Sequence, residues 1–70
     1  MADYFKTIDA RKEVERIRAM AGDNEAAHSA EDELHAKVLL AISEGRTKNP
    51  RVLAMVALST SEIEFERWYA

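Results

Sequence analysis

The 70-residue sequence contains no cysteine, one proline and two glycines. Without cysteine, it can form neither a disulfide framework nor a thiolate metal site. Two isolated glycines cannot build a glycine-rich phosphate loop, and both stand where a helix would end. The longest apolar run, residues 52–58, is far too short to cross a membrane, and nothing resembles a signal peptide. We therefore expect a cytoplasmic protein that does not contact the membrane.

The chain is short enough to form one domain, residues 1–70. A domain of this size buries only about 60% of its unfolded surface, so its margin of stability is thin. Small domains without disulfides or structural metal ions rely on well-packed helices or on a partner subunit. Stability alone therefore makes a homodimer worth considering.

Charge is mild overall but unevenly distributed. The formal net charge is −3. Residues 45–51 carry three bases, whereas residues 23–44 carry one base, Lys37, against six acids: Asp23, Glu25, Glu31, Asp32, Glu33 and Glu44. A nucleic-acid-binding protein needs a basic face, so this balance argues against nucleic acid as a partner.

Residues 24–44 predict a long amphipathic helix at the centre of the fold. Asp23 is a good N-cap, and Gly45 suits a left-handed C-cap. A later start near Ala30, capped by Ser29, is the alternative to a start near Asn24. Apolar residues at three- and four-residue steps form a stripe along this helix. The stripe contains Ala27, Ala30, Leu34, Val38, Ala41 and Ile42, and Leu39 is expected to widen it.

Shorter helices are predicted on both sides of the central one. Residues 9–21 repeat apolar positions at Ala10, Val14, Ile17 and Ala21, with Thr7 or Asp9 as the cap. Residues 50–59 follow the start signal Asn49-Pro50 and are apolar almost all round, which predicts the most buried element. A capping box at residues 61–64 predicts a short last helix at 62–68. The expected fold is an all-α three-helix bundle with a short fourth C-terminal helix.

Four side chains of the central helix could hold a divalent metal. His28, Glu31, Asp32 and His35 are spaced i, i+3, i+4 and i+7, so they are expected on one side. We call them the histidine–carboxylate face. The Asp32-x-x-His35 pair has the spacing of ligands in carboxylate-bridged di-metal bundles. The alternative is a solvated polar face without metal, which such spacing on an acidic helix usually indicates.

The last third of the chain approximates a helix-turn-helix unit. Ala54 lies in its first helix, small residues at 59–61 form its turn, and Ile63 lies in its second helix. The second helix carries Glu62, Glu64 and Glu66, which would repel phosphates. A tight helix–helix corner is the favoured interpretation.

Aromatic residues gather near the C-terminal end at Phe65, Trp68 and Tyr69. Such a cluster either closes a small core or anchors a partner. Serines and threonines stand at predicted caps and turns, where hydrogen bonds to the backbone explain them. The sequence shows no pattern that pairs a nucleophile with a general base, so no catalytic residue is predicted.

Several runs of the sequence carry a resemblance. They are HSAEDEL at 28–34, VL-x-AI-x-x-G at 38–45, AL-x-T at 57–60 and I-x-F-x-RW at 63–68. Together they resemble small proteins of unknown function encoded in bacterial prophages and other mobile elements. The resemblance covers residues 23–70 and implies a small cytoplasmic helical protein, with no activity to carry over.

The leading hypothesis is a non-enzymatic protein-interaction module, for example a mobile-element accessory protein that modulates a host protein. Its partner-binding residues would be Glu31, Asp32, His35, Phe65 and Trp68. The alternatives are a metal-binding helical protein that uses the histidine–carboxylate face, and a helix-turn-helix DNA-binding protein.

Overall fold

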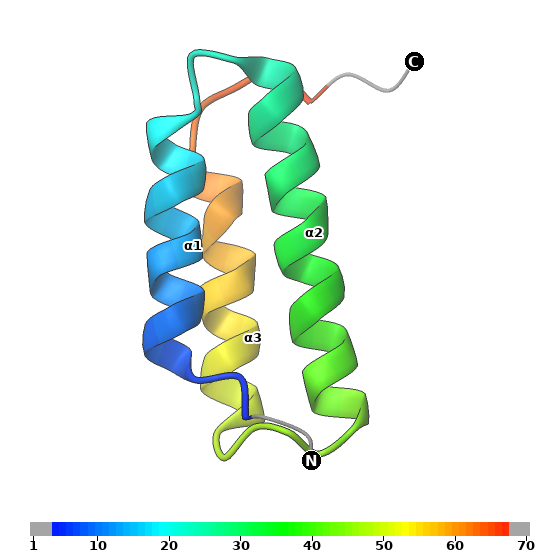
Figure 1. Cartoon of the computed structure of the whole chain (residues 1–70). Coiled ribbons are helices and arrows are strands. Elements are labelled where there is room, and N and C mark those ends of the chain that lie inside the picture. The colour runs from blue at the N-terminus through cyan, green and yellow to red at the C-terminus, as the bar shows by residue number, and fades with distance from the viewer. Residues whose placement is uncertain (1–3, 68–70) are drawn as a thin grey trace.

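The computed structural model of the chain describes residues 4–67 and forms a three-helix bundle, in which the second helix runs antiparallel to the first and the third (Figure 1). They are α1 (Thr7–Ala19), α2 (Asn24–Ser43) and α3 (Pro50–Leu58), and a 3₁₀ turn, η1 (Ser59–Glu62), follows directly. Each helix packs on the other two. Within residues 4–67 there is no strand. The predicted all-α, three-helix fold is therefore confirmed.

The central helix begins and ends where its capping residues predict. The Asp23 carboxylate accepts a hydrogen bond from the backbone N–H of Ala26 at 3.1 Å. Gly45 has a φ of 68°, the left-handed conformation that glycine adopts without a steric cost. Helix α2 runs without interruption past Ser29, which confirms the earlier of the two predicted starts.

The core lies between the three helices. The predicted stripes on residues 9–21 and 24–44 supply most of it, and both are confirmed. Leu39, however, is an exposed residue and does not widen the stripe. The buried apolar residues are Ala10, Val14, Ile17, Ala27, Ala30, Leu34, Val38, Ala41, Leu53, Val56, Ala57 and Ile63.

Helices α1 and α3 depart from their predictions in capping and burial. Helix α1 starts already at Thr7, and its N-cap, Lys6, makes no side-chain capping bond, so the predicted caps are wrong. Pro50 opens α3 as predicted, but the Asn49 side chain does not cap it. Helix α3 buries Leu53, Val56 and Ala57, whereas Met55 and Leu58 on its circumference are exposed.

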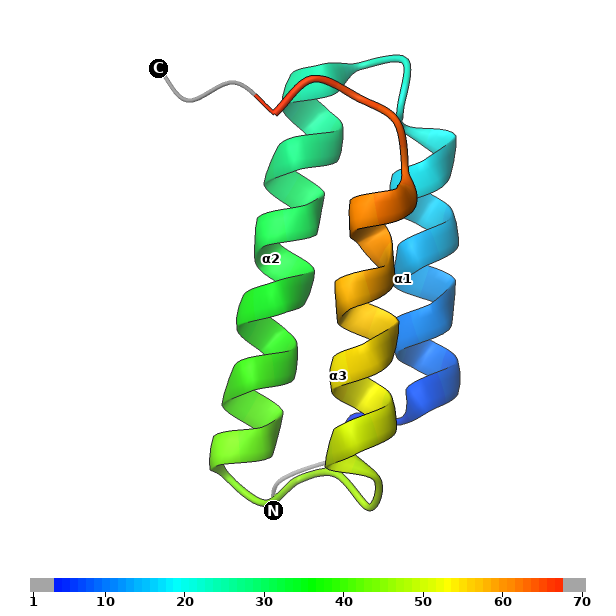
Figure 2. The ribbon, with the colours of Figure 1, turned by 180° about the vertical axis from the view of Figure 1, so that it is seen from behind.

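The predicted helix at 62–68 is wrong. Beyond η1, residues 63–67 are not helical, and the segment crosses the end of the bundle toward the start of α2 (Figure 2). A continuing helix would use the carbonyls of Thr60 and Ile63 as backbone acceptors, but both accept hydrogen bonds from the Arg67 guanidinium. The helix-turn-helix prediction is wrong for the same reason, since no second helix exists within the described residues after η1.

Candidate functional site

The structure divides the histidine–carboxylate face between two environments. Glu31 is buried and His35 half-buried, and both reach the end of α3 and the segment that follows it. Asp32 is exposed, and one of its carboxylate oxygens lies 3.6 Å from Nε2 of His28. Within residues 4–67, no three His, Asp or Glu side chains are grouped closely enough to hold a metal ion.

Glu31 forms an ion pair with Arg67 across 36 residues of sequence. Arg67 Nε donates to Glu31 Oε1 at 2.9 Å, and a terminal nitrogen donates to Oε2 at 3.0 Å. This two-point geometry is the strong form of an arginine–carboxylate contact. The sequence predicted the Glu31 carboxylate on an exposed face. In the structure it is already paired with a cation of the same chain.

The charge of Glu31 is maintained by this pairing. Burial alone raises the pKa of a carboxyl group, but the hydrogen bonds and the positive charge of Arg67 outweigh burial here. The pKa of Glu31 consequently lies below its ordinary value of 4.5.

His35 fastens α2 to the end of α3. Its Nε2 lies 2.9 Å from the Ala57 carbonyl and 3.0 Å from Oγ1 of Thr60. A carbonyl can only accept, so Nε2 carries a proton. Thr60 is fully buried and its hydroxyl donates to the same carbonyl. The His35–Thr60 pair is therefore part of the packing, and no substrate can reach the hydroxyl.

Further contacts hold the C-terminal segment on the bundle. The Asn24 side-chain oxygen accepts from the backbone N–H of Glu66 at 3.2 Å. The Arg67 guanidinium also lies over the Phe65 ring, 3.9 Å from its centroid. Phe65 is half-buried and packs against the core, as the core-closing interpretation predicts. Trp68 and Tyr69 lie outside the described residues.

Sequence reasoning missed Thr60 and Arg67 as members of this network. One signal was available for their partner: Glu31 follows Ala27 by four residues and precedes Leu34 by three, so it lies on the core stripe itself. A carboxylate at that position requires a cationic partner. The partner could not be identified, because residues 63–67 had been predicted as a helix.

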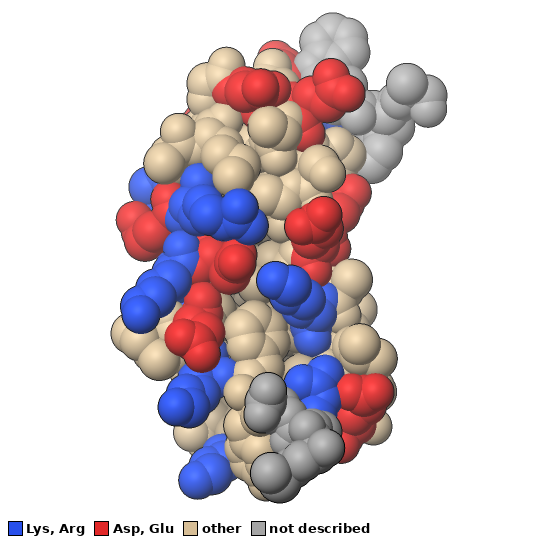
Figure 3. Space-filling model, viewed as in Figure 1, with Lys and Arg blue, Asp and Glu red and all other residues tan. Residues whose placement is uncertain are grey.

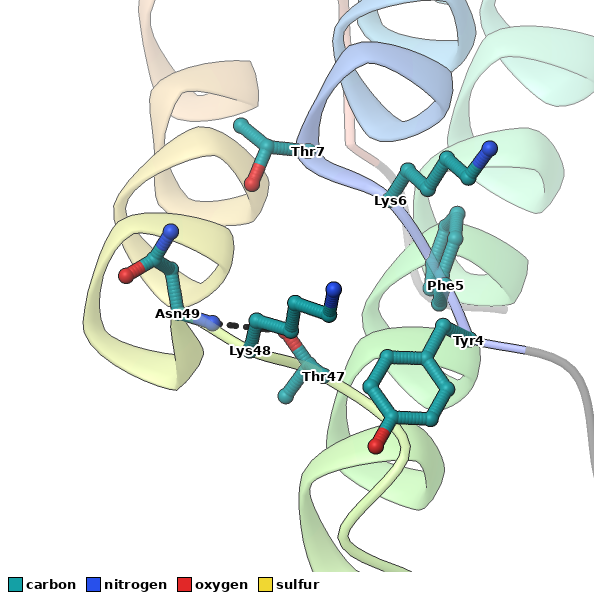
Figure 4. Close-up of a pocket in the computed structure, with 7 residues that line it drawn as sticks. All are labelled: Tyr4, Phe5, Lys6, Thr7, Thr47, Lys48 and Asn49. Carbon is teal, nitrogen blue, oxygen red and sulfur yellow. Dashed lines mark hydrogen bonds between the residues drawn. The ribbon is translucent and has the colours of Figure 1, made fainter.

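A pocket opens between the segments that precede α1 and α3 (Figure 4). Lys6 and Lys48 are among the residues lining it, and Lys48 Nζ lies 5.8 Å from the centroid of the Tyr4 ring. Both lysines are exposed. Solvent screens such charges, so the pocket offers only weak attraction for an anion.

Large apolar side chains remain exposed on the outside of α2 and α3. Leu39 is 68% exposed, Met55 61% and Leu58 68%. We call these three residues the α2–α3 apolar face. Figure 3 shows the face of the molecule on which charged side chains run along α1 and α2.

Contacts between helices indicate on which side of α2 and of α3 Leu39 and Leu58 lie. His35 bonds to α3 and Lys37 pairs with Glu13 of α1 at 3.9 Å, which identifies the α3 side and the α1 side of α2. Leu39 follows His35 by one turn and lies on the α3 side. By the same spacing, Leu40 follows Lys37 and lies on the α1 side.

The same reasoning places the α3 residues. Val56 lines a hollow with residues of α1, whereas the Ala57 carbonyl meets His35 of α2. Leu58 is one further step of 100° around the helix, so it points outward beside α2. Helices α2 and α3 are antiparallel, and His35 lies opposite the last turn of α3. Met55 therefore lies at about the same height along the bundle as Leu39.

Comparisons of the chain with protein-family models, with characterised proteins and with solved structures gave no match. The arrangement of its own side chains is therefore the basis for a functional conclusion.

Proposed function

We propose that this protein is a non-enzymatic protein-interaction module that binds its partner through the α2–α3 apolar face. The observation that carries the proposal is the exposure of three large apolar residues, Leu39, Met55 and Leu58, on two helices that pack against each other. Contiguous exposed apolar surface on a small protein marks an interaction site, whereas single exposed side chains do not.

The distribution of large apolar residues supports this proposal. The core holds seven of them: Val14, Ile17, Leu34, Val38, Leu53, Val56 and Ile63. Seven others are exposed: Tyr4, Ile8, Leu39, Leu40, Val52, Met55 and Leu58. A chain this short has little apolar surface to spare, so leaving these seven large residues of the described part exposed weakens the fold unless a partner covers them.

The predicted partner-binding residues take different roles in this proposal. Asp32 is exposed and precedes Leu39 by two turns of α2, so it can contribute charge beside that residue. Glu31, His35 and Phe65 support the scaffold from inside. A divalent metal on the histidine–carboxylate face is the less favoured alternative, because Arg67 already neutralises Glu31. An accessory role for a mobile element, acting on a host protein, is the biological setting we propose.

Affinity capture from bacterial lysate tests the proposal. Three tagged proteins are compared, each co-expressed with an untagged copy: the wild type, the double variant Leu39→Glu/Leu58→Glu and Leu40→Glu. The last is the control, because it changes an exposed leucine on the α1 side of α2. We expect the wild type and Leu40→Glu to retain the same specific protein, and the double variant to lose it, with unchanged circular dichroism. Equal recovery by all three proteins, or no specific recovery, would contradict the proposal.

A further inference from the structure

We propose that the pocket between residues 4–7 and 47–49 is a binding site for a small aromatic anion, a ring that carries a carboxylate or phosphate group. The pocket shares no residue with the α2–α3 apolar face, so this inference goes beyond the proposed function and does not rest on it. Its size, its fixed walls, its exposed ring and its charge support the inference.

The pocket has the size of a small-molecule site, and hydrogen bonds hold both of its walls. Its volume is about 630 Å³, and pockets that bind small molecules usually measure about 300–1,000 Å³. On one wall, the Phe5 N–H donates to the Arg46 carbonyl at 2.9 Å. On the other, the Asn49 N–H donates to Oγ1 of Thr47 at 3.3 Å. Because the chain itself positions the walls, a ligand does not have to order them.

The wall formed by residues 4–7 carries two aromatic rings with different roles. Phe5 packs against the core, whereas Tyr4 is 52% exposed. The Tyr4 ring is therefore open to a second ring, and aromatic pairs attract each other in offset-stacked or edge-to-face arrangements. This ring favours an aromatic ligand.

Lys48 supplies the charge for the anionic group. Its side chain extends from the opposite wall toward the segment that carries Tyr4, and its Nζ lies 5.8 Å from the centroid of the Tyr4 ring (Figure 4). A ring stacked on Tyr4 could therefore hold an acidic substituent within reach of the ammonium group. Among the described residues that line the pocket, none is Asp or Glu, so no carboxylate there competes for the lysine.

Two helix starts add to the preference for an anion. Helices α1 and α3 begin beside the pocket, and the side chains of Lys6 and Asn49 do not cap them. The amides of their first turns leave partial positive charge at this end of the bundle. These charges and an exposed lysine hold an anion only weakly, so contact with the ring has to provide much of the binding.

Titration of the isotope-labelled full chain with phenyl phosphate, followed by NMR, tests the site. We expect amide shifts at residues 4–7 and 47–49 that saturate with a Kd of about 0.1–1 mM. Inorganic phosphate and phenol each provide one half of the probe and should bind at least about tenfold more weakly. The absence of saturable shifts at these residues up to about 10 mM phenyl phosphate would overturn the inference. Equal binding of inorganic phosphate would overturn the aromatic class of ligand.

Three variants test the assigned contacts. Tyr4→Ala and Lys48→Gln should each weaken the binding of phenyl phosphate by about five- to tenfold. Both side chains are exposed, so circular dichroism should stay unchanged. Lys12→Gln is the matched control, because Lys12 is an exposed lysine of α1 that does not line the pocket. Unchanged binding by Tyr4→Ala and Lys48→Gln, or equal weakening by Lys12→Gln, would contradict the inference.

This inference and the proposed function can fail separately. Leu39→Glu/Leu58→Glu should bind phenyl phosphate as the wild type does, because neither leucine lines the pocket. Tyr4→Ala should retain the protein that is captured through the α2–α3 apolar face. Loss of phenyl phosphate binding in the leucine variant would show that the site is not confined to the pocket and would overturn the inference.

Discussion

Glu31 keeps its charge on the side of α2 that faces the core, and Arg67 offsets the cost of burying it. Neither side chain reaches its partner through local sequence. The pair instead joins α2 to a segment that contributes only five described residues beyond η1. Removing one member leaves the other charge poorly solvated, which usually costs more than the intact pair contributes.

The pH dependence of stability tests this pair. Because the folded pKa of Glu31 lies below 4.5, its charge stabilises the fold above that value, and the contribution is lost as the pH falls through the folded pKa. Glu31→Gln should lower the free energy of unfolding by about 1–3 kcal/mol at neutral pH. In urea titrations, the difference in unfolding free energy between the variant and the wild type should narrow as the pH falls below 4.5.

Glu33→Gln is the matched control, since Glu33 is exposed on the same helix. Its effect should stay within about 0.5 kcal/mol at every pH. A gap for Glu31→Gln that is constant with pH would contradict the account of this pair.

At the scale of the helix, α2 has two kinds of leucine. Leu34 is buried against α1 and α3, whereas Leu39 points outward beside α3. Both are large and apolar, and both belong to the broad apolar pattern of the sequence. Only packing distinguishes their roles, one in the fold and the other in the proposed interface.

Truncating each leucine separates these roles. Leu34→Ala should lower the free energy of unfolding by about 2–5 kcal/mol, because it removes buried methyl groups and leaves a cavity. Leu39→Ala should change it by less than about 0.5 kcal/mol. Chemical denaturation should be measured at dilution, where association does not add to stability. Comparable losses for the two variants would show that Leu39 is part of the core.

Sequence predicts the helices well where the signals are local. Asp23 and Gly45 set the ends of α2 through their own capping chemistry, and three- and four-residue spacing identifies its buried side. The last segment could not be predicted this way, because its path depends on Arg67 reaching Glu31, which lies 36 residues away in sequence. The apolar face was missed for a related reason: whether an apolar residue is covered depends on how many helices surround it.

At the scale of the whole molecule, three helices provide too few neighbours to cover every apolar side of α2 and α3. Within residues 4–67, no helix has the length and apolar character needed to cross a membrane. We propose the α2–α3 apolar face as the surface that a protein partner covers.

Backbone amide chemical shifts, followed by NMR as the partner recovered by affinity capture is added to the labelled protein, test this proposal most directly. The account predicts progressive shifts at residues around Leu39, Met55 and Leu58, with little change on the outer side of α1. Shifts confined to α1, or no shifts on addition of the partner, would contradict it.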